Sequence, residues 1–261
     1  MSPKSIQLIL PMAGKGSRFA ESGYLEPKPM LPIGDYPMYL TVLANVYDIR
    51  ISSITIVKQE SLELNQDLER LFTPLGIKVE LINLVTFTDG AATTVESALT
   101  NLDPDLPVVI VNSDQYVVGN LVSFYDALVS GAFSGVILGM NDTDPKWSYI
   151  RLNDEGFVSE VVEKVVVSNL ATVGIYGFAS ARLCKNAISK MKELEFRVNG
   201  EFYMAPAYNF LPAEAKPIHH INLGWVGDVM FGLGIPVDYE SFLSSPQLSQ
   251  ANLHTKTIFG K

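Results

Sequence analysis

The stretch LPMAGKGSRF, residues 10–19, follows directly on the apolar run IQLIL at residues 6–10. The run predicts a buried strand, and Gly14 and Gly16 after it allow a tight turn whose amides can approach an anion. A dinucleotide fold places a third glycine where this chain has Phe19. The Walker loop ending in glycine–lysine–serine is also absent. The stretch therefore indicates phosphate chemistry of another kind.

Basic residues accompany this glycine-rich segment. Lys15 and Arg18 lie within it, and Lys28 follows between two prolines, Pro27 and Pro29, that restrict its backbone. A guanidinium can form paired hydrogen bonds with phosphate oxygens, and a lysine adds a point charge. A bare Gly-x-Gly pair is also typical of an ordinary tight turn, and the alternative for Lys28 is a solvated lysine in a loop, but the combination of these features favours phosphate binding.

Short apolar runs alternate with helical segments over the first 145 residues. Apolar runs of strand length separated by helices are typical of a Rossmann-like α/β fold, a mainly parallel sheet flanked by helices, whose ligands gather at the carboxyl ends of the strands. The expected strands are 5–11, 52–58, 77–84, 107–112 and 133–140, and the expected helices are 37–49, 62–72, 91–102 and 121–131.

The pattern changes after residue 145. Residues 147–164 predict a hairpin turned at NDEG, followed by a strand at 171–179 and a helix to about Leu194, so the sheet should carry a small antiparallel addition. We expect a single domain over 1–243. Residues 244–261 are polar and weakly patterned, which predicts a C-terminal tail or an oligomer arm.

Composition excludes several classes of protein. The net charge of −9 argues against a nucleic-acid-binding surface. The single cysteine, Cys184, cannot form an internal disulfide and is expected to be a buried helical thiol in a reducing compartment. No apolar stretch is long enough to span a membrane and no signal peptide is evident, so the prediction is a cytoplasmic protein without a membrane partner.

PMAGKGSRF at 11–19, followed by PKPMLPIGDYPM at 27–38, resembles the signature of the sugar nucleotidyltransferases, which include the nucleoside-diphosphate-sugar pyrophosphorylases and their cytidylyltransferase relatives. The resemblance implies a GT-A-like nucleotidyltransferase fold with a nucleotide-binding half at about 1–145 and an acceptor-binding half at about 146–243. It continues to about residue 240 through TDGAATTVESAL, VNSDQYV, EKVVVSNLATVGIYGF, NGEFYMAPAYN and FGLGIPVDYESF.

This resemblance implies a reaction between two anions. A phosphate oxygen of the acceptor attacks the α-phosphorus of a nucleoside triphosphate and pyrophosphate leaves, which requires positioning and charge neutralisation and no obligatory general base. By family position, Arg18 and Lys28 hold the phosphates. Asp114, just past the strand at 107–112, is expected to bind Mg²⁺ as cofactor. Its alternative role is to cap a helix.

Nucleotide and acceptor contacts carry over by resemblance to two groups of residues. Small residues at 90 and 91 leave room for the base, whereas Thr93 and Glu96 form a capping-box pattern and are expected to be structural. The expected nucleotide-binding set is Met12, Ala13, Gly14, Lys15, Gly16, Gly90, Ala91 and Ser113, and the acceptor-binding set is Glu163, Lys164, Gly174, Glu201, Tyr203 and Asn209. On the residues alone, Glu163 and Lys164 could equally form an exposed ion pair.

The closing motif departs from the family pattern. Gly232 stands where many members have a second metal-binding aspartate, and Ile235 replaces the usual threonine. Asp228 is a candidate second metal ligand, and a one-metal mechanism is also open. Asp-x-Asp look-alikes at 103–105 and 142–144 are expected to be turn residues. The adjacent histidines 219 and 220 are weak metal-ligand candidates, and the aromatics of WVGDVMF at 225–231 are expected in the core.

The leading hypothesis is therefore a nucleotidyltransferase that joins a triphosphate to a phosphorylated small molecule. A glycosyltransferase that consumes a nucleotide sugar and a non-catalytic nucleotide-binding module are the alternatives. The TDGAATTVESAL loop mildly favours CTP. The acceptor is expected to be a sugar phosphate or a phosphorylated polyol, choline or amino-acid-like compound used for surface polysaccharide, and family habit predicts a homo-oligomer.

Overall fold

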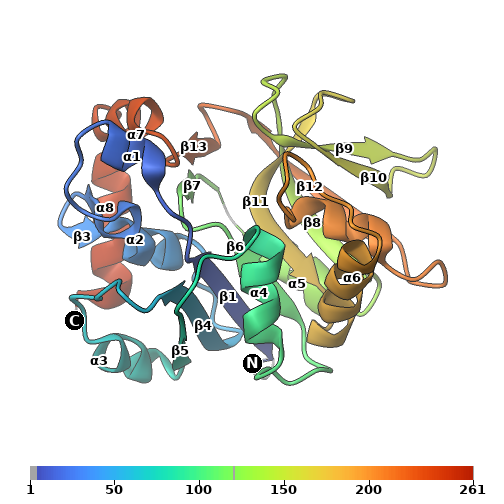
Figure 1. The fold of residues 1–261 in the computed structure, drawn as a ribbon, viewed down its shortest axis with the longest axis horizontal. Helices are drawn as coiled ribbons and strands as arrows, with labels where there is room; N and C mark the ends of the chain where they lie inside the picture. The colour runs from blue at the N-terminus through green and yellow to red at the C-terminus, as the bar shows by residue number, and fades with distance from the viewer. Residues whose placement is uncertain (1–4, 120, 261) are drawn as a thin grey trace.

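A sheet of nine strands runs through the centre of the computed structural model, which describes residues 5–119 and 121–260 (Figure 1). Its order is β10-β9-β11-β6-β1-β4-β5, with β8 paired to β11 and β12 paired to β8. The strands are β1 Ile6–Met12, β4 Ile51–Gln59, β5 Lys78–Leu84, β6 Val108–Val111, β8 Gly135–Asn141, β9 Ser148–Leu152, β10 Val158–Glu163, β11 Leu170–Phe178 and β12 Ile218–Trp225.

Two small antiparallel sheets and a set of helices complete the fold. The small sheets pair β2 Pro32–Ile33 with β3 Tyr36–Pro37, and β7 Gln115–Val117 with β13 Met230–Gly232. The α-helices are α1 Ser17–Glu21, α2 Met38–Asn45, α3 Leu68–Phe72, α4 Ala91–Leu99, α5 Val122–Val129, α6 Ala181–Glu193, α7 Pro236–Leu243 and α8 Gln247–Phe259, and the 3₁₀ helices are η1 Lys28–Met30, η2 Thr73–Leu75 and η3 Ala205–Phe210.

The predicted fold class is confirmed. Strands β6, β1, β4 and β5 pair with one another in parallel, as the alternation of strands and helices predicts. Beyond β6 the sheet becomes mixed, because β11 runs antiparallel to both β6 and β8. The predicted hairpin is β9–β10, which pairs antiparallel around the NDEG turn.

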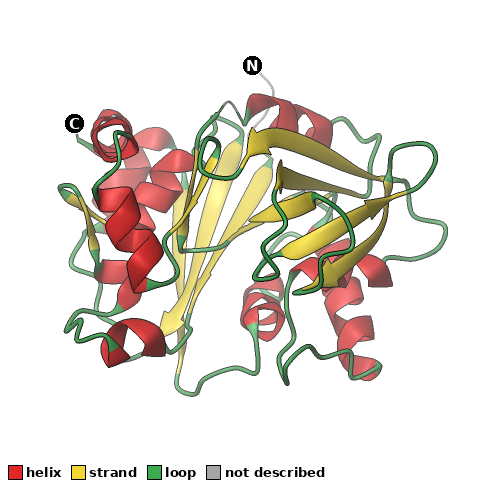
Figure 2. Cartoon of the chain, turned by 90° about the horizontal axis from the view of Figure 1, so that it is seen from above, coloured by secondary structure: helices red, strands yellow, loops and turns green. Residues whose placement is uncertain are grey.

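Helices cover both faces of the sheet (Figure 2). Successive residues of β1 serve opposite faces, as the period of a strand requires. Leu8 and Leu10 pack in the cluster that contains α2 and α5, whereas Ile9 packs in the cluster that contains α4 and α6. A strand buried on both sides reads as an unbroken apolar run, which is why residues 6–10 lack alternation.

A third apolar cluster joins the first loop to the last helices. Phe19, which occupies the position of the missing third glycine, is 1% exposed and contacts Tyr24 and Tyr239 edge-to-face. The same cluster contains Leu31 and Leu233, together with residues of α7 and α8. Phe19 therefore anchors the glycine-rich loop to the C-terminal segment.

Residues 247–259 correct the prediction of a polar tail. They form α8, which packs beside α2, so that the red end of the chain lies next to the blue segment in Figure 1. Ala251, Thr255 and Phe259 are buried, spaced four residues apart on one face. That face is short and carries a threonine, which is why the hydrophobic pattern of the segment is weak in the sequence.

Two further expectations are corrected, and a third is confirmed. Helix α3 covers only the end of the predicted 62–72 helix, since Asp67 caps it by accepting a hydrogen bond from the Arg70 amide. Strand β12 was not among the predicted elements, and Trp225 at its end is exposed instead of lying in the core. Cys184 is buried in α6, as expected, and burial raises its pKa.

Within the described residues, no helix has the length and apolar character needed to cross a membrane.

The packing of α8 gives a first testable prediction. Phe259→Ala removes a ring that lies 4.9 Å from the ring of Phe72, and should lower the free energy of unfolding by about 3 kcal/mol. Leu253→Ala, on the exposed side of the same helix, should change it by less than about 0.5 kcal/mol. Denaturant unfolding of both variants measures this. Equal midpoints would show that α8 is a dispensable tail after all.

Candidate active site

A cavity of about 1130 Å³ opens at the carboxyl ends of β1 and β6. This is the edge at which parallel α/β sheets bind ligands. The cavity is bounded by the glycine-rich loop, by the start of α4, by the β6–β7 turn, by the ends of β9 and β10, and by the segments at 201–205 and 232–238. Both predicted substrate-binding halves therefore contribute walls to one space.

The glycine-rich loop forms the first wall. Met12 ends β1 and Ala13 follows it. Both are buried, and they line the cavity together with Gly14, Lys15 and Gly16. Gly16 has a φ of 61°, a left-handed conformation that favours glycine. A Cβ at Gly14 would meet no atom within 4 Å, so that glycine faces open space in the cavity and not a packed neighbour.

Lys28 and Asp114 form an ion pair across the cavity. The Lys28 Nζ atom lies 2.7 Å from Oδ2 of Asp114, and the two side chains are 21% and 29% exposed. Lys28 begins the 3₁₀ helix η1 between Pro27 and Pro29, which restrict the backbone that carries it. The pair brings together two of the three residues that the sequence assigned to catalysis.

Arg18, the third of these residues, also lines the cavity. It projects from α1, is exposed, and has no acidic partner among residues 5–119 and 121–260. Lys15 lies over the ring of Phe87, with Nζ 5.4 Å from the ring centroid. Three basic side chains thus surround the glycine-rich loop, and Arg18 is free to bind an anion.

Asp114 is held from behind by the closing segment of the chain. The Leu233 amide donates to the Asp114 carbonyl at 2.8 Å, beside the β7–β13 pairing. A Cβ at Gly234 would lie 2.8 Å from Asp114 Oδ2, so this glycine leaves space for the carboxylate. Ser113 is buried and lines the cavity next to it. Asp114 is therefore fixed in the cavity wall and does not cap a helix.

Asp114 is a carboxylate of the cavity wall that could contribute to holding a magnesium ion. No group of three or more His, Cys, Asp or Glu side chains in the described ranges is arranged to hold a metal. Mg²⁺ typically takes one or two carboxylates, and phosphate and water oxygens supply its other ligands. Asp114 provides one such carboxylate beside Lys28 in the cavity wall.

Asp228 does not reach the cavity. It is exposed in the turn between β12 and β13, where its amide donates to the Trp225 carbonyl at 3.1 Å. The carboxylate nearest the missing aspartate is instead that of Asp238 in α7, whose Oδ2 lies 3.4 Å from the point where a Cβ of Gly232 would stand. Asp238 lines the cavity and pairs with Lys146 at 3.5 Å.

The start of α4 forms another wall of the cavity. Gly90 and Ala91 line it, together with Thr88 and Thr94, whose hydroxyl oxygens lie 2.6 Å apart. Gly90 has a φ of 137°, and a Cβ there would lie 2.4 Å from the carbonyl oxygen of Phe202. The positive φ and the close approach of the Phe202 backbone therefore require glycine at position 90.

Glu163 and Lys164 lie at the other end of the cavity and do not form an exposed ion pair with each other. Glu163 is 7% exposed and accepts a hydrogen bond from the Ser148 hydroxyl. Burial raises the pKa of Glu163. Lys164 donates to the hydroxyl of Tyr203, and its Nζ lies 4.3 Å from the centroid of that ring. The two charges therefore serve different contacts.

The remaining acceptor candidates separate into two groups. Glu201 and Tyr203 line the cavity, as does Gly174, where a Cβ would lie 2.1 Å from Gln115 Oε1. Asn209 does not line it. Its side-chain amide bonds both the N–H and the carbonyl of Val161, at 2.8 and 2.7 Å, so it braces the edge of β10.

The capping-box prediction is also wrong. Gly90 precedes α4 as its N-cap, Thr93 donates to Asp89 Oδ1 at 2.6 Å, and Glu96 pairs with Lys192 of α6. The partner of Glu96 comes from another part of the chain, so the local spacing of residues could not identify it.

A family model described as nucleotidyl transferase matches residues 7–200, which is most of the chain. The chain belongs to this family. It is therefore a nucleotidyltransferase enzyme, as the glycine-rich and proline-flanked segments of the sequence indicated.

Solved structures of this fold superimpose along almost the whole chain. A nucleoside-diphosphate-sugar pyrophosphorylase from Vibrio cholerae RC9 has a TM-score of 0.76 at 24% identity, covering 91% of this chain and 100% of that one. A putative glucose-1-phosphate thymidylyltransferase from Bacillus anthracis has a TM-score of 0.72 at 17% identity, covering 94% and 99%. The inositol-1-phosphate CTP transferase from T. maritima scores 0.72 at 12% identity, covering 98% of each chain.

Several lining residues of this nucleotidyltransferase had no signal in the sequence. Phe87, Lys146, Trp147 and Asp238 all face the cavity. The ammonium of Lys146 lies 4.7 Å from the centroid of the Trp147 ring, and the indole donates to Asp142 at 2.5 Å. Each comes from a turn or from the first turn of a helix, where no periodic pattern distinguishes a lining side chain from a solvated one.

The surroundings of Gly90 and Gly14 predict opposite effects of alanine substitution on folding stability. Gly90→Ala places a methyl group against Phe202 in a left-handed backbone, so it should lower the free energy of unfolding by more than about 2 kcal/mol. Gly14→Ala meets open space and should change it by less than about 0.5 kcal/mol. Urea unfolding compares the two, and a similar loss in both variants would contradict the geometry.

The raised pKa of Glu163 predicts a specific pH dependence of the free energy of unfolding. Its raised pKa means that the folded state binds the proton more tightly than the unfolded state, so this contribution to stability is present at low pH and is lost as pH rises above about 4.5. Glu163→Gln should therefore be more stable than the wild type at about pH 8 and similar to it at about pH 4. Denaturant midpoints at both values test this. Glu160 is exposed on the same strand, so the effect of Glu160→Gln on the midpoint should not differ between the two pH values.

Proposed function

We propose that this nucleotidyltransferase joins a nucleoside triphosphate to a phosphorylated small molecule and releases pyrophosphate. The observation that carries the proposal is the Lys28–Asp114 pair beside the glycine-rich loop, in the same cavity as Glu163 and Lys164. The cavity combines basic groups suited to a triphosphate with a second basic site suited to an acceptor phosphate. A cavity of about 1130 Å³ has room for both reactants.

In this reaction a phosphate oxygen of the acceptor forms a bond to the α-phosphorus of the triphosphate. The bond between the α-phosphorus and the bridging oxygen breaks, and pyrophosphate leaves with that electron pair. Arg18 and Lys28 would neutralise the charge on the triphosphate and hold it against the amides of the glycine-rich loop. No side chain needs to remove a proton, since the attacking phosphate is already ionised near neutral pH.

The acceptor would lie against the far end of the cavity. Lys164, which contacts Tyr203 and lines the cavity, would bind the acceptor phosphate. Glu163 is buried and aligned by Ser148, and Glu201 lies nearby, so hydroxyl or amine groups of the acceptor have acidic partners. This arrangement fits a sugar phosphate or a phosphorylated polyol or amine.

Asp114 would carry the magnesium ion together with the phosphate oxygens. When bound, Mg²⁺ supplies charge neutralisation at the phosphates. The Asp114 carboxylate lies 2.7 Å from the Lys28 ammonium group. The ion held by Asp114 and the ammonium group of Lys28 would therefore neutralise the negative charge of the substrate together. The separation of Asp228 from the cavity supports a site that uses Asp114 without it.

CTP is the first nucleotide to test. The fold is shared with an inositol-1-phosphate CTP transferase, although the identity of 12% extends only to the fold. The loop TDGAATTVESAL, which presents Gly90 and Ala91 to the cavity, is the sequence feature that favours CTP. A role in surface polysaccharide synthesis stays a prediction from the sequence.

A thermal-shift titration with CTP, UTP, dTTP, GTP and ATP, with and without Mg²⁺, tests the proposal. One triphosphate should stabilise the wild type by roughly 2–4 kcal/mol at 100 to 1,000 times its dissociation constant. Lys28→Ala should weaken that affinity by about tenfold or more, because it removes a charge-assisted contact. Asp114→Asn should abolish the magnesium dependence of the shift.

Arg182→Ala is the matched control, because it removes an exposed ion pair with Asp105 away from the cavity and should leave the titration unchanged. Pyrophosphate release with phosphorylated sugars, polyols and amines then identifies the acceptor. Stabilisation by nucleotide sugars and by none of the triphosphates would contradict the proposal and favour a glycosyltransferase. Triphosphate binding without pyrophosphate release on any acceptor would favour a non-catalytic module.

A further inference from the structure

Two segments from different parts of the chain meet beside the cavity. The Phe202 amide donates to the Asp89 carbonyl at 2.9 Å, and the Ala92 amide donates to the Phe202 carbonyl at 3.0 Å. Gly90 allows this approach, since any Cβ would lie within 2.9 Å of three backbone atoms of Phe202. The loop before α4 and the segment around Phe202 are therefore joined at backbone distance.

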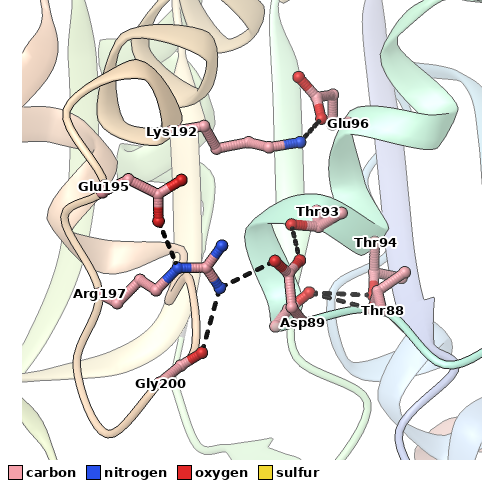
Figure 3. A network of polar contacts seen from close by, with 10 residues as sticks. Thr88, Asp89, Thr93, Thr94, Glu96, Lys192, Glu195, Arg197 and Gly200 are labelled. Carbon is pink, nitrogen blue, oxygen red and sulfur yellow. Dashed lines mark hydrogen bonds and ion pairs between the residues drawn. The ribbon is translucent and has the colours of Figure 1, made fainter.

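Arg197 fastens the same junction with its side chain (Figure 3). Its Nη1 atom donates to Asp89 Oδ2 at 2.8 Å and to the Gly200 carbonyl at 3.2 Å, and Nε donates to Glu195 at 2.7 Å. The guanidinium carbon lies 3.9 Å from the centroid of the Phe202 ring. One side chain thus contacts the loop before α4 and three points of its own segment.

Asp89 is arranged to receive this contact as an anion. Thr93 donates to its Oδ1 atom at 2.6 Å while Arg197 occupies Oδ2. The Thr93 hydrogen bond, followed by that of Arg197, lowers the pKa of Asp89. The carboxylate is therefore charged and oriented at neutral pH.

The joined segments present different residues to the cavity. Gly90 and Ala91 directly follow Asp89 and line the wall assigned to the nucleotide. Glu201 and Tyr203 flank Phe202 and line the wall assigned to the acceptor, where Tyr203 also contacts Lys164. A displacement of either segment would therefore move the wall of the other.

We propose that the Asp89–Arg197 bridge is a positioning device that couples the nucleotide wall to the acceptor wall, so that a bound nucleotide also orders Glu201 and Tyr203. The inference rests on the proposed function, because it requires a nucleotide on the Gly90 side. Arg197 and Asp89 touch neither substrate in this arrangement and act through the residues beside them.

The second bridge in Figure 3 separates coupling from simple cross-linking. Lys192 of α6 pairs with Glu96 of α4 at 2.5 Å and, like Arg197, joins the α4 region to the α6 region. Neither residue lines the cavity or contacts the loop at 88–90. Lys192→Ala is therefore a matched control that loses an inter-segment ion pair and leaves the junction at Phe202 intact.

Hydrogen–deuterium exchange of the full-length protein with Mg²⁺ and CTP, or whichever triphosphate gives the thermal shift, tests the proposal without an acceptor. In the wild type, nucleotide should slow exchange at residues 13–18, at 88–92 and, by about fivefold or more, at 198–204. Arg197→Ala should retain the effect at 13–18 and lose it at 198–204. Lys192→Ala should behave as the wild type.

Arg197→Lys keeps a cation opposite Asp89 but loses the fork, so it should retain part of the effect at 198–204. A half-exposed ion pair contributes little to folding stability, so all these variants are expected to fold. Slowed exchange at 13–18 with no change at 198–204 in the wild type would overturn the coupling and leave the proposed function standing. Full coupling in Arg197→Ala would overturn the role of the Asp89–Arg197 bridge. No slowing at 13–18 with any triphosphate would overturn the proposed function and the coupling with it.

Discussion

The contact between Lys28 and Asp114 joins segments that are 86 residues apart and fixes the centre of the cavity. Each partner is held by a different part of the fold. Asp114 leaves the carboxyl end of β6 and is backed by the strand β13, whereas Lys28 stands in a 3₁₀ turn between two prolines. The contact places an ammonium group and a carboxylate side by side in a partly exposed part of the cavity wall. The parallel strands matter to this site because they bring the two segments to the same edge of the sheet.

Local signals account for what the sequence predicted well. The strand at β1, the turn around Gly16 and the proline-flanked Lys28 are all determined by neighbouring residues, and the fold class follows from the alternation of such elements. Family resemblance added Asp114, Glu163 and Lys164, which all line the cavity.

Contacts between distant segments account for what the sequence did not show. Asp238 lies beside Gly232 only because α7 folds back over β13, and Asn209 turns to β10 because η3 passes that edge. Helix α8 was mistaken for a tail since its buried face consists of small or polar residues and one aromatic. In each case the decisive partner lies on another element, and spacing along the chain carries no information about it.

The position of Phe19 has a consequence for the order in which the molecule is built. Its ring packs against Tyr239 of α7, and Tyr24 donates a hydrogen bond to Glu240 at 2.8 Å. The glycine-rich loop after β1 is therefore completed by residues more than 200 positions later in the sequence. During synthesis, β1 and its neighbouring parallel strands can assemble early, but the aromatic side of the glycine-rich loop has no partner until α7 emerges from the ribosome. Closure over such a long separation in sequence is slow compared with local helix formation. The glycine-rich loop is therefore among the last of the described segments to reach its final shape.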